Sequence, residues 1–458
     1  MDKTNNLKHL LLLVVLALAG FFTASCSKDD ETNDSPKGSE AIDELVENVE
    51  FEIISDTIIT ATQIVGAVLD AVGANGDERL ELARMIFLKK QQDIAERNGA
   101  KGAEMGWRSV CYNYTSIDEQ GKEIKLSARV YWGNISGVDI SPDYVMLCPH
   151  HTLMADAECP TNAETYEAAV LCGDNLLVLP DYIGFGATKD RVQSYVNHNL
   201  CAQNCIDALA AGYKVFRKNS IAQLDDNYKL YVAGASQGGG NSLAIHKWLD
   251  THPDIADAWR FAYSYNCAGP YSPAITFREY FRQDILTAPC MIPIALKAMI
   301  AAYPDILGRW TEADFYSNDY VENLKDKLDA MIESKQYTTN DVNAVFIERY
   351  QQSGETDGIG SPVIHIADIL SADALNPESE MCKALFKCLD DNDLTKNWTP
   401  IHPIYLVHGT DDTIVPYANA EAVKEAFPDK TTLTNSTLGG GHLLTCLMWM
   451  VHVMSRTW

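Results

Sequence analysis

The segment that most constrains this chain places a serine on a tight turn between a strand and a helix. Residues 234–238 read Gly-Ala-Ser-Gln-Gly; they follow the apolar, β-rich residues 228–233 and precede residues 241–249, which have a helical pattern. The glycines on both sides of the serine let strand and helix pack closely around the turn. Because G-x-S-x-G also occurs by chance, the context carries the prediction. Ser236 is therefore a candidate nucleophile, and the alternative is an ordinary Gly-rich turn.

A serine nucleophile needs a base to take its proton and an acid to orient that base. Residues 404–407 predict a strand, and Asp411 and Asp412 lie in the polar loop that follows it. Asp412 is the expected acid because it stands at D-x-x-V-P spacing, with Asp411 as the alternative. His442 is the expected base, since it follows three glycines and precedes the apolar helix 443–453.

Three other histidines have less suitable settings. His246 lies within the helix after the serine, His198 lies in the amphipathic segment 193–216, and His408 belongs to the turn before the acid loop. We interpret His408 as structural, His246 as packed or exposed within its helix, and His198 as a weaker candidate than His442.

The developing oxyanion of an acyl-transfer reaction needs two hydrogen-bond donors. The first expected donor is the backbone N–H of Gln237, the residue after the serine. The second should come from a loop after an earlier strand. Residues 144–148 predict such a strand and His151 and Thr152 follow it, so the backbone N–H of Thr152 is the expected second donor.

Taken together, residues 234–238, 408–416 and 441–442 resemble the motifs of the α/β-hydrolase superfamily. Residues 177–186 resemble the P-D-Y-x-G-x-G segment of secretory-lipase-like esterases, and residues 151–152 with 159–161 resemble their H-G-T…P-S stretch, although Thr152 stands where many relatives have glycine. The resemblance runs from about residue 107 to the C-terminus.

This resemblance implies a serine carboxylic ester hydrolase that needs neither cofactor nor metal. It implies that Ser236, Asp412 and His442 form the catalytic triad. It also implies that His151, Asp181 and Tyr182 support the oxyanion loop. The substrate stays open among acyl glycerols, small esters and carbohydrate esters.

Strand and helix patterns alternate along most of the chain, which predicts an α/β fold with a mostly parallel central sheet and helices on both faces. Residues 107–114 and 123–132 predict an antiparallel pair that opens the sheet. We expect the core to comprise residues 105–270 and 398–458, with a helical cap at 271–397 and an N-terminal helical extension at 41–104. The apolar cap residues are expected either to line an acyl pocket or to form the cap's own core: Phe277, Tyr280, Phe281, Met291, Ile292 and Trp310.

The first residues predict export from the cytoplasm. A basic start is followed by an apolar run at 10–22, too short to span a membrane, so residues 1–25 are expected to be a signal peptide. Small residues directly before Cys26 resemble a bacterial lipoprotein cleavage box. We therefore expect Cys26 to be lipidated, with a polar tether at 26–40 and an outer-membrane location, either periplasmic or surface-exposed. The alternative is a plain secretory signal.

Charge and cysteine spacing exclude some classes of function. The 458 residues include 63 acidic and 36 basic side chains, a net charge of −27, which disfavours nucleic acid and other polyanions as partners. No C-x-x-C occurs among the 12 cysteines, so zinc-site spacing is absent from the sequence. No sequence feature bears on oligomeric state.

Two rival functions remain open from the sequence. A serine peptidase of the same fold would need an acidic pair to grip a peptide N-terminus, for which Glu158 and Glu164 are the candidates. A non-catalytic binding lipoprotein would retain the fold but would not need the three triad positions.

Overall fold

The computed structural model describes residues 40–64, 96, 105–173, 175–351, 356, 362–436 and 441–455. The expected signal peptide, Cys26 and the tether up to residue 39 lie outside these residues. No helix in the described part of the chain is both long and apolar enough to cross a membrane.

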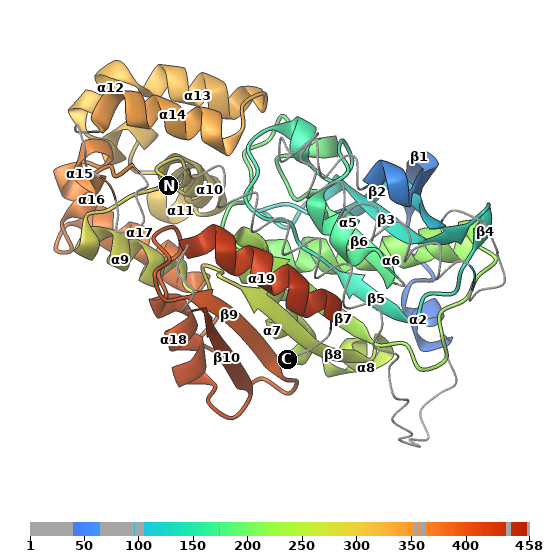
Figure 1. The fold of residues 1–458 in the computed structure, drawn as a ribbon. Helices are drawn as coiled ribbons and strands as arrows, with labels where there is room; N and C mark the ends of the chain where they lie inside the picture. Colours follow the sequence, from blue (N-terminus) through green and yellow to red (C-terminus); the bar gives the residue numbers. More distant parts are fainter. Residues whose placement is uncertain are drawn as a thin grey trace, which may run out of the picture.

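A ten-stranded mixed sheet forms the centre of the molecule (Figure 1). Nine strands follow the order β1-β2-β3-β6-β5-β7-β8-β9-β10, and β4 pairs with β3. Neighbouring strands are antiparallel from β1 to β6 and parallel from β6 to β10. The strands are β1 (Phe51–Thr60), β2 (Met105–Ile117), β3 (Glu123–Ile135), β4 (Val138–Asp139), β5 (Tyr144–Leu147), β6 (Asn175–Pro180), β7 (Leu230–Ala235), β8 (Phe261–Cys267), β9 (Ile404–Gly409) and β10 (Thr431–Ser436).

Helices cover both faces of this sheet because the central strands are apolar on both faces. On β7, Leu230 and Val232 join one buried cluster with helices α6 and α7, whereas Tyr231 and Ala233 join another with α5 and α19. The helices and 3₁₀ turns around the sheet are α2 (Glu40–Leu45), η1 (Asp156–Glu158), α5 (Tyr166–Leu171), η2 (Gly186–Thr188), α6 (His198–Asn219), α7 (Gln237–Asp250), α8 (Pro253–Ala258), α18 (Ala418–Ala426) and α19 (Gly441–Ser455). The α/β architecture expected from the sequence is confirmed.

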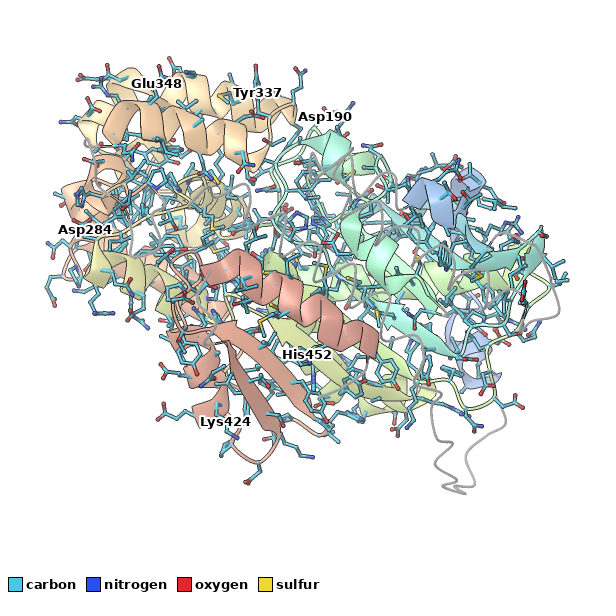
Figure 2. The ribbon with its side chains drawn as sticks, viewed as in Figure 1. Asp190, Asp284, Tyr337, Glu348, Lys424 and His452 are labelled. Carbon is cyan, nitrogen blue, oxygen red and sulfur yellow. The ribbon has the colours of Figure 1, made fainter. Side chains whose placement is uncertain are left out.

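Between β8 and β9 the chain forms a helical cap with its own buried cluster, at the carboxyl ends of the parallel strands (Figure 1). All named elements described in this stretch are helical: α9 (Pro273–Gln283), α10 (Met291–Ala302), α11 (Pro304–Leu307), η3 (Glu312–Phe315), α12 (Asn318–Asn323), α13 (Lys325–Ser334), α14 (Thr339–Tyr350), α15 (Ile366–Ile369), α16 (Ala372–Leu375) and α17 (Glu380–Asp391). The outer surface is polar, as exposed Asp190 on the core and Glu348 on the cap illustrate (Figure 2).

The structure corrects the expected N-terminal helical extension. Phe51–Thr60 is not helical but forms edge strand β1, antiparallel to β2. The isoleucines of this segment fit a helical spacing, but the edge of β2 offers backbone hydrogen bonds to a β-branched strand. Of the remainder of 41–104, the structure describes only 41–50, 61–64 and residue 96.

The expected helix 193–216 also begins later than its sequence pattern indicates. Helix α6 starts at His198, and the residues just before it form a loop in which Val196 has a positive φ of 51°. This loop brings Tyr195 and Val196 to the candidate site described next.

Candidate active site

Ser236 lies at the junction between β7 and α7 in a backbone conformation that side-chain-bearing residues rarely adopt. Its φ is 58° and its ψ is −124°. The Ser236 N–H donates to the Cys267 carbonyl of β8 (2.9 Å), and the Ser236 carbonyl accepts from the N–H groups of Gly239 and Gly240 at 2.9 and 3.2 Å. These bonds hold the turn, so the serine is fixed at the carboxyl edge of the sheet.

The two motif glycines are required by close backbone contacts. A Cβ at Gly234 would lie 2.3 Å from the Gly238 carbonyl oxygen, and a Cβ at Gly238 would lie 2.2 Å from the Pro149 carbonyl oxygen. Pro149 opens the loop that carries Thr152, so Gly238 lets this loop approach the start of α7.

We expect Gly238→Ala to damage the site more than the fold. The added methyl group must displace the Pro149 backbone, a clash of a kind that costs about 1–3 kcal/mol of unfolding free energy. A shift of about 1 Å in a site can lower activity about 100-fold. The measurements are thermal unfolding and ester hydrolysis.

The control variant is Gly121→Ala, where φ is 71° but no atom lies within 4 Å of the new Cβ. It should carry a backbone cost of about 1–2 kcal/mol and retain its activity. Equal activity in Gly238→Ala and Gly121→Ala would contradict the proposed close fit.

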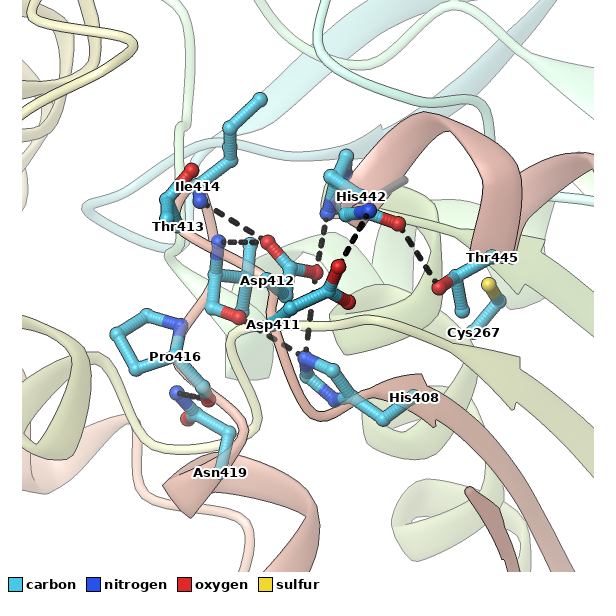
Figure 3. A network of polar contacts seen from close by, with 12 residues as sticks. Cys267, His408, Asp411, Asp412, Thr413, Ile414, Pro416, Asn419, His442 and Thr445 are labelled. Atoms are coloured by element: carbon cyan, nitrogen blue, oxygen red, sulfur yellow. Dashed lines mark hydrogen bonds and ion pairs between the residues drawn. The ribbon is translucent and has the colours of Figure 1, made fainter. Parts of the chain in front are cut away.

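An aspartate–histidine pair lies at the neighbouring edge, in the loop after β9 and at the start of α19 (Figure 3). His442 Nδ1 is 2.7 Å from Asp412 Oδ2, and the Asp412 side chain is fully buried. Its other oxygen, Oδ1, accepts the N–H groups of Ile414 and Val415 at 2.9 Å each. An aspartate in this position holds Nδ1 protonated and leaves Nε2 as the basic nitrogen of His442.

Asp411 and His408 have different positions in the same loop (Figure 3). Asp411 Oδ2 accepts the backbone N–H of Gly441 at 3.2 Å. His408 Nε2 donates to the Val415 carbonyl at 2.9 Å and is 3.4 Å from Asp412 Oδ2. Of the two candidate acids, Asp412 is therefore the one whose side chain contacts the imidazole of His442.

Burial and ion pairing act in opposite directions on the two groups of this pair. Burial disfavours the Asp412 carboxylate, but the charge of His442 and the hydrogen bonds from His408 and His442 outweigh it and keep the pKa of Asp412 below its usual value. Burial also disfavours the His442 imidazolium, but the Asp412 carboxylate and the side chain of Cys446 outweigh it and raise the pKa of His442 well above its usual value.

This raised pKa predicts the pH dependence of any reaction that uses His442 as a base. Only the neutral imidazole accepts a proton, so kcat/KM should fall as pH decreases through the pKa of His442. The acidic limb of the profile should therefore lie above the ordinary histidine value of about 6.5. The measurement is kcat/KM from pH 5 to 9 at constant ionic strength, with folding monitored by fluorescence. A limb at or below about 6.5 in a protein that stays folded would contradict this account.

Two cysteines connect the serine turn to the helix that carries His442. Cys267, whose carbonyl accepts the Ser236 N–H, has its Sγ 3.9 Å from Cys446 Sγ. Cys446 lies one turn after His442 on α19. Cys446 was not among the candidate site residues, although its i, i+4 spacing from His442 places both on one face of a helix.

The loop after β5 contacts Tyr182, one of the residues that the resemblance singled out. The His150 ring stacks on Tyr182 with centroids 4.0 Å apart, and the Tyr182 hydroxyl donates to the His150 carbonyl at 3.0 Å. Farther along the loop, Thr152 Oγ1 is 3.4 Å from the Tyr195 hydroxyl. Gln237 is the first residue of α7, where helix geometry leaves backbone N–H groups without an intrahelical acceptor. Oxyanion binding by Gln237 and Thr152 stays a prediction.

Two buried carboxylates form hydrogen bonds with residues in and around this loop. Asp181 accepts hydrogen bonds from Ser127 Oγ (2.6 Å) and from the Thr161 N–H (2.9 Å); burial raises its pKa to about 6. Glu167 Oε1 is 2.8 Å from His151 Nδ1, and although burial opposes ionisation, the charge of His151 lowers the pKa of Glu167 to about 2. No sequence pattern indicated Glu167, because its partner His151 is 16 residues away.

The remaining histidines from the sequence analysis have structural partners. His246 is buried between Ser264 Oγ (2.7 Å from Nδ1) and Asp250 Oδ2 (3.0 Å from Nε2). His198 is buried and its Nδ1 is 3.0 Å from the Asn392 carbonyl oxygen. Neither contacts Asp412, so His442 remains the candidate base.

An apolar cavity of about 20 Å³ opens beside Ser236, under the cap. Ser236 and Gln237 line it together with Val415 of the acid loop, so the serine turn and the acid loop face the same space. Phe277, Tyr280 and Met291 from the expected set line it too. The others, Phe281, Ile292 and Trp310, pack into the cap cluster instead. Tyr195 and Val196 were missed because the amphipathic pattern of 193–216 placed them in a helix, whereas they lie in the loop before α6.

Solved structures with the same architecture identify the fold. A rice cell wall degrading esterase, LipA from Xanthomonas oryzae, matches with 18% identity over 88% of this chain and 97% of its own, at a TM-score of 0.63. The chain has the α/β-hydrolase fold. Candida antarctica lipase A in its closed state matches with 14% identity over 89% of this chain and 82% of its own, at a TM-score of 0.53. No sequence-family model and no curated protein sequence matches the chain.

Proposed function

We propose that this chain is a serine hydrolase of carboxylic esters that acts through Ser236, Asp412 and His442. The observation that carries the proposal is the joint geometry of the strained Ser236 turn and the buried Asp412–His442 pair, on loops that face one apolar cavity. The esterase and lipase names of the two structural neighbours agree with this chemistry.

In the proposed reaction, Ser236 Oγ attacks the carbonyl carbon of the ester while His442 Nε2 takes the hydroxyl proton. Asp412 stabilises the imidazolium that forms. The backbone N–H groups of Gln237 and Thr152 donate to the oxyanion. His442 then protonates the departing alcohol, which leaves an acyl group on Ser236.

Water completes the reaction in the reverse sense. His442 deprotonates a water molecule, which attacks the acyl-enzyme carbonyl, and the carboxylic acid leaves as Ser236 regains its proton. No cofactor takes part in these steps.

A peptidase function is less well supported because one of its two candidate carboxylates, Glu164, is already paired with a cation. Glu164 forms an ion pair with Arg129 and accepts the Tyr131 hydroxyl at 2.6 Å. Glu158 Oε2 is 3.4 Å from the backbone N–H of Ala155. Glu164 is thus already neutralised by Arg129 instead of being available to a peptide N-terminus.

Parallel assays on matched substrates test the proposal. The protein should hydrolyse p-nitrophenyl acetate and should leave p-nitroacetanilide and aminoacyl p-nitroanilides untouched, because the site has an apolar cavity for an acyl group and Glu164 is already paired with Arg129. Amide hydrolysis at a rate comparable to ester hydrolysis would favour the peptidase. If Ser236→Ala retained both activities, the esterase and the peptidase proposals would both be overturned.

We also propose that the protein is anchored to an outer membrane through a lipid on Cys26. The support is the sequence around Cys26 described above. Cys26→Ser should move the protein from the membrane fraction to the soluble fraction, and Cys111→Ser should not. Membrane retention of Cys26→Ser would refute the lipid anchor and leave the proposed enzymatic activity unaffected.

A further inference from the structure

The cavity beside Ser236 is apolar and bounded by side chains that are themselves fixed. Tyr280 and Phe277 from α9 form part of its wall and are each 5% exposed. The Tyr280 hydroxyl donates to the Ile414 carbonyl at 2.5 Å, which ties the cap to the acid loop. Tyr195, on the opposite loop, is 5% exposed with its hydroxyl 3.4 Å from Thr152 Oγ1. The wall cannot retreat without breaking these contacts.

The size of the cavity sets the size of the group that it accepts. Its volume of about 20 Å³ is far below the roughly 150 Å³ of an apolar cavity that holds the six carbons of benzene, so it has room for about one or two carbon atoms. An acyl group bound to Ser236 must place its carbonyl at the oxyanion site and its carbon chain in adjoining apolar space. The cavity adjoins both Ser236 and Gln237, the residue whose N–H is the proposed oxyanion donor.

We propose that this cavity is the acyl site and that Phe277 and Met291 restrict the substrate to esters of short acids, of about two or three carbons. The inference rests on the proposed function of Ser236. The alcohol portion lies outside the cavity, so its size is not restricted by these walls. A longer acyl chain must displace the Phe277 ring or the Met291 side chain.

The two walls differ in how firmly they resist a longer chain. Phe277 packs against Tyr280, with ring centroids 6.1 Å apart, and belongs to the buried cap cluster. Met291 opens α10, is only partly buried, and has a flexible thioether side chain. Phe277 should therefore set the limit, while Met291 allows some adjustment.

The test is the ratio of kcat/KM across p-nitrophenyl acetate, butyrate, hexanoate and octanoate, measured below the solubility limit of each ester. Wild type should prefer acetate over octanoate by at least about 100-fold, since excluding each methylene costs about a tenfold factor or more. Phe277→Ala should raise the hexanoate-to-acetate ratio at least about tenfold. Met291→Ala should raise it less.

Phe281→Ala is the neighbouring control: Phe281 lies one turn further on the same helix and packs against Phe386 and the Phe277 ring, but it does not line the cavity. Its ratio should shift much less than that of Phe277→Ala, because only Phe277 borders the cavity. If Phe277→Ala does not fold, as judged by circular dichroism, Phe277→Leu and Met291→Ala provide the same comparison.

Three outcomes separate this inference from the proposed function. If kcat/KM is the same for all four esters, or highest for octanoate, while activity is lost in Ser236→Ala, the short-acyl inference is overturned and the proposed esterase function stands. An equal shift of the ratio in Phe281→Ala and Phe277→Ala overturns the assignment of Phe277. Undiminished hydrolysis by Ser236→Ala overturns the proposed function itself.

Discussion

Asp412→Asn should lower kcat for ester hydrolysis by about 10⁴ while the protein stays folded. Asp412 Oδ2 accepts the His442 Nδ1 proton at 2.7 Å, and an asparagine amide in that position can donate instead, which favours the wrong tautomer of the imidazole. The carbonyl oxygen of the asparagine can still accept the N–H groups of Ile414 and Val415, so the loop should keep its shape. The measurement is kcat on p-nitrophenyl acetate, with thermal unfolding recorded for the same sample.

Asp411→Asn is the matched control for this prediction. Asp411 accepts a hydrogen bond from the backbone of Gly441. The Asp411→Asn substitution therefore removes the same charge one residue away from Asp412. Its loss in kcat should be less than about tenfold, because a displaced backbone contact leaves the tautomer of His442 unchanged. Equal losses in the two variants would contradict the assignment, and a larger loss in Asp411→Asn would identify Asp411 as the acid.

Ser236→Ala should have the largest effect of all, a fall in kcat of about 10⁶. The variant removes the oxygen that attacks the ester in the proposed mechanism, and the methyl group of alanine fits wherever the serine side chain does. Alanine is no worse suited than serine to the positive φ at this position, so the fold should survive. Activity on p-nitrophenyl acetate and thermal unfolding provide the two readings.

Ser242→Ala is the matched control, six residues further along the same helix. Ser242 Oγ donates to the Gly238 carbonyl at 2.7 Å, so its loss should cost about 1 kcal/mol of stability and less than about tenfold in kcat. A Ser236→Ala variant with more than about a tenth of wild-type activity would place the nucleophile elsewhere.

The central strands could be predicted from the sequence because each is a short apolar run next to a turn or a helical pattern. β7 and β9 bury almost every residue, and burial on both faces leaves a continuous apolar signal. β10 carries Thr-Thr-Leu-Thr-Asn-Ser and lies at the edge of the sheet, so it has no such run. β1 depends on a partner strand about 50 residues later, a non-local contact that its own isoleucine spacing conceals.

The candidate site, too, could be predicted from the sequence where it depends on local motifs and not where it depends on long-range packing. Ser236, Asp412 and His442 stand in local motifs, and the structure brings Asp412 and His442 into contact and turns the loops of Ser236 and Asp412 toward one cavity. The walls of that cavity come from the cap and from the loop before α6. Which aromatic side chains face Ser236 depends on how α9 packs against the acid loop, and the sequence pattern of α9 predicts only that its apolar face is buried.

The most direct test of the central claim is to identify the residue that a fluorophosphonate probe modifies in the folded protein. An activated serine displaces fluoride from the probe and keeps the phosphonyl group, whereas an ordinary serine does not react. Peptide mass spectrometry should find one phosphonyl adduct per chain, on Ser236, and the adduct should disappear in Asp412→Asn and His442→Ala under the same conditions. A folded wild-type protein that remains unlabelled, or that is labelled at a different residue, would contradict the assignment of Ser236 as the nucleophile.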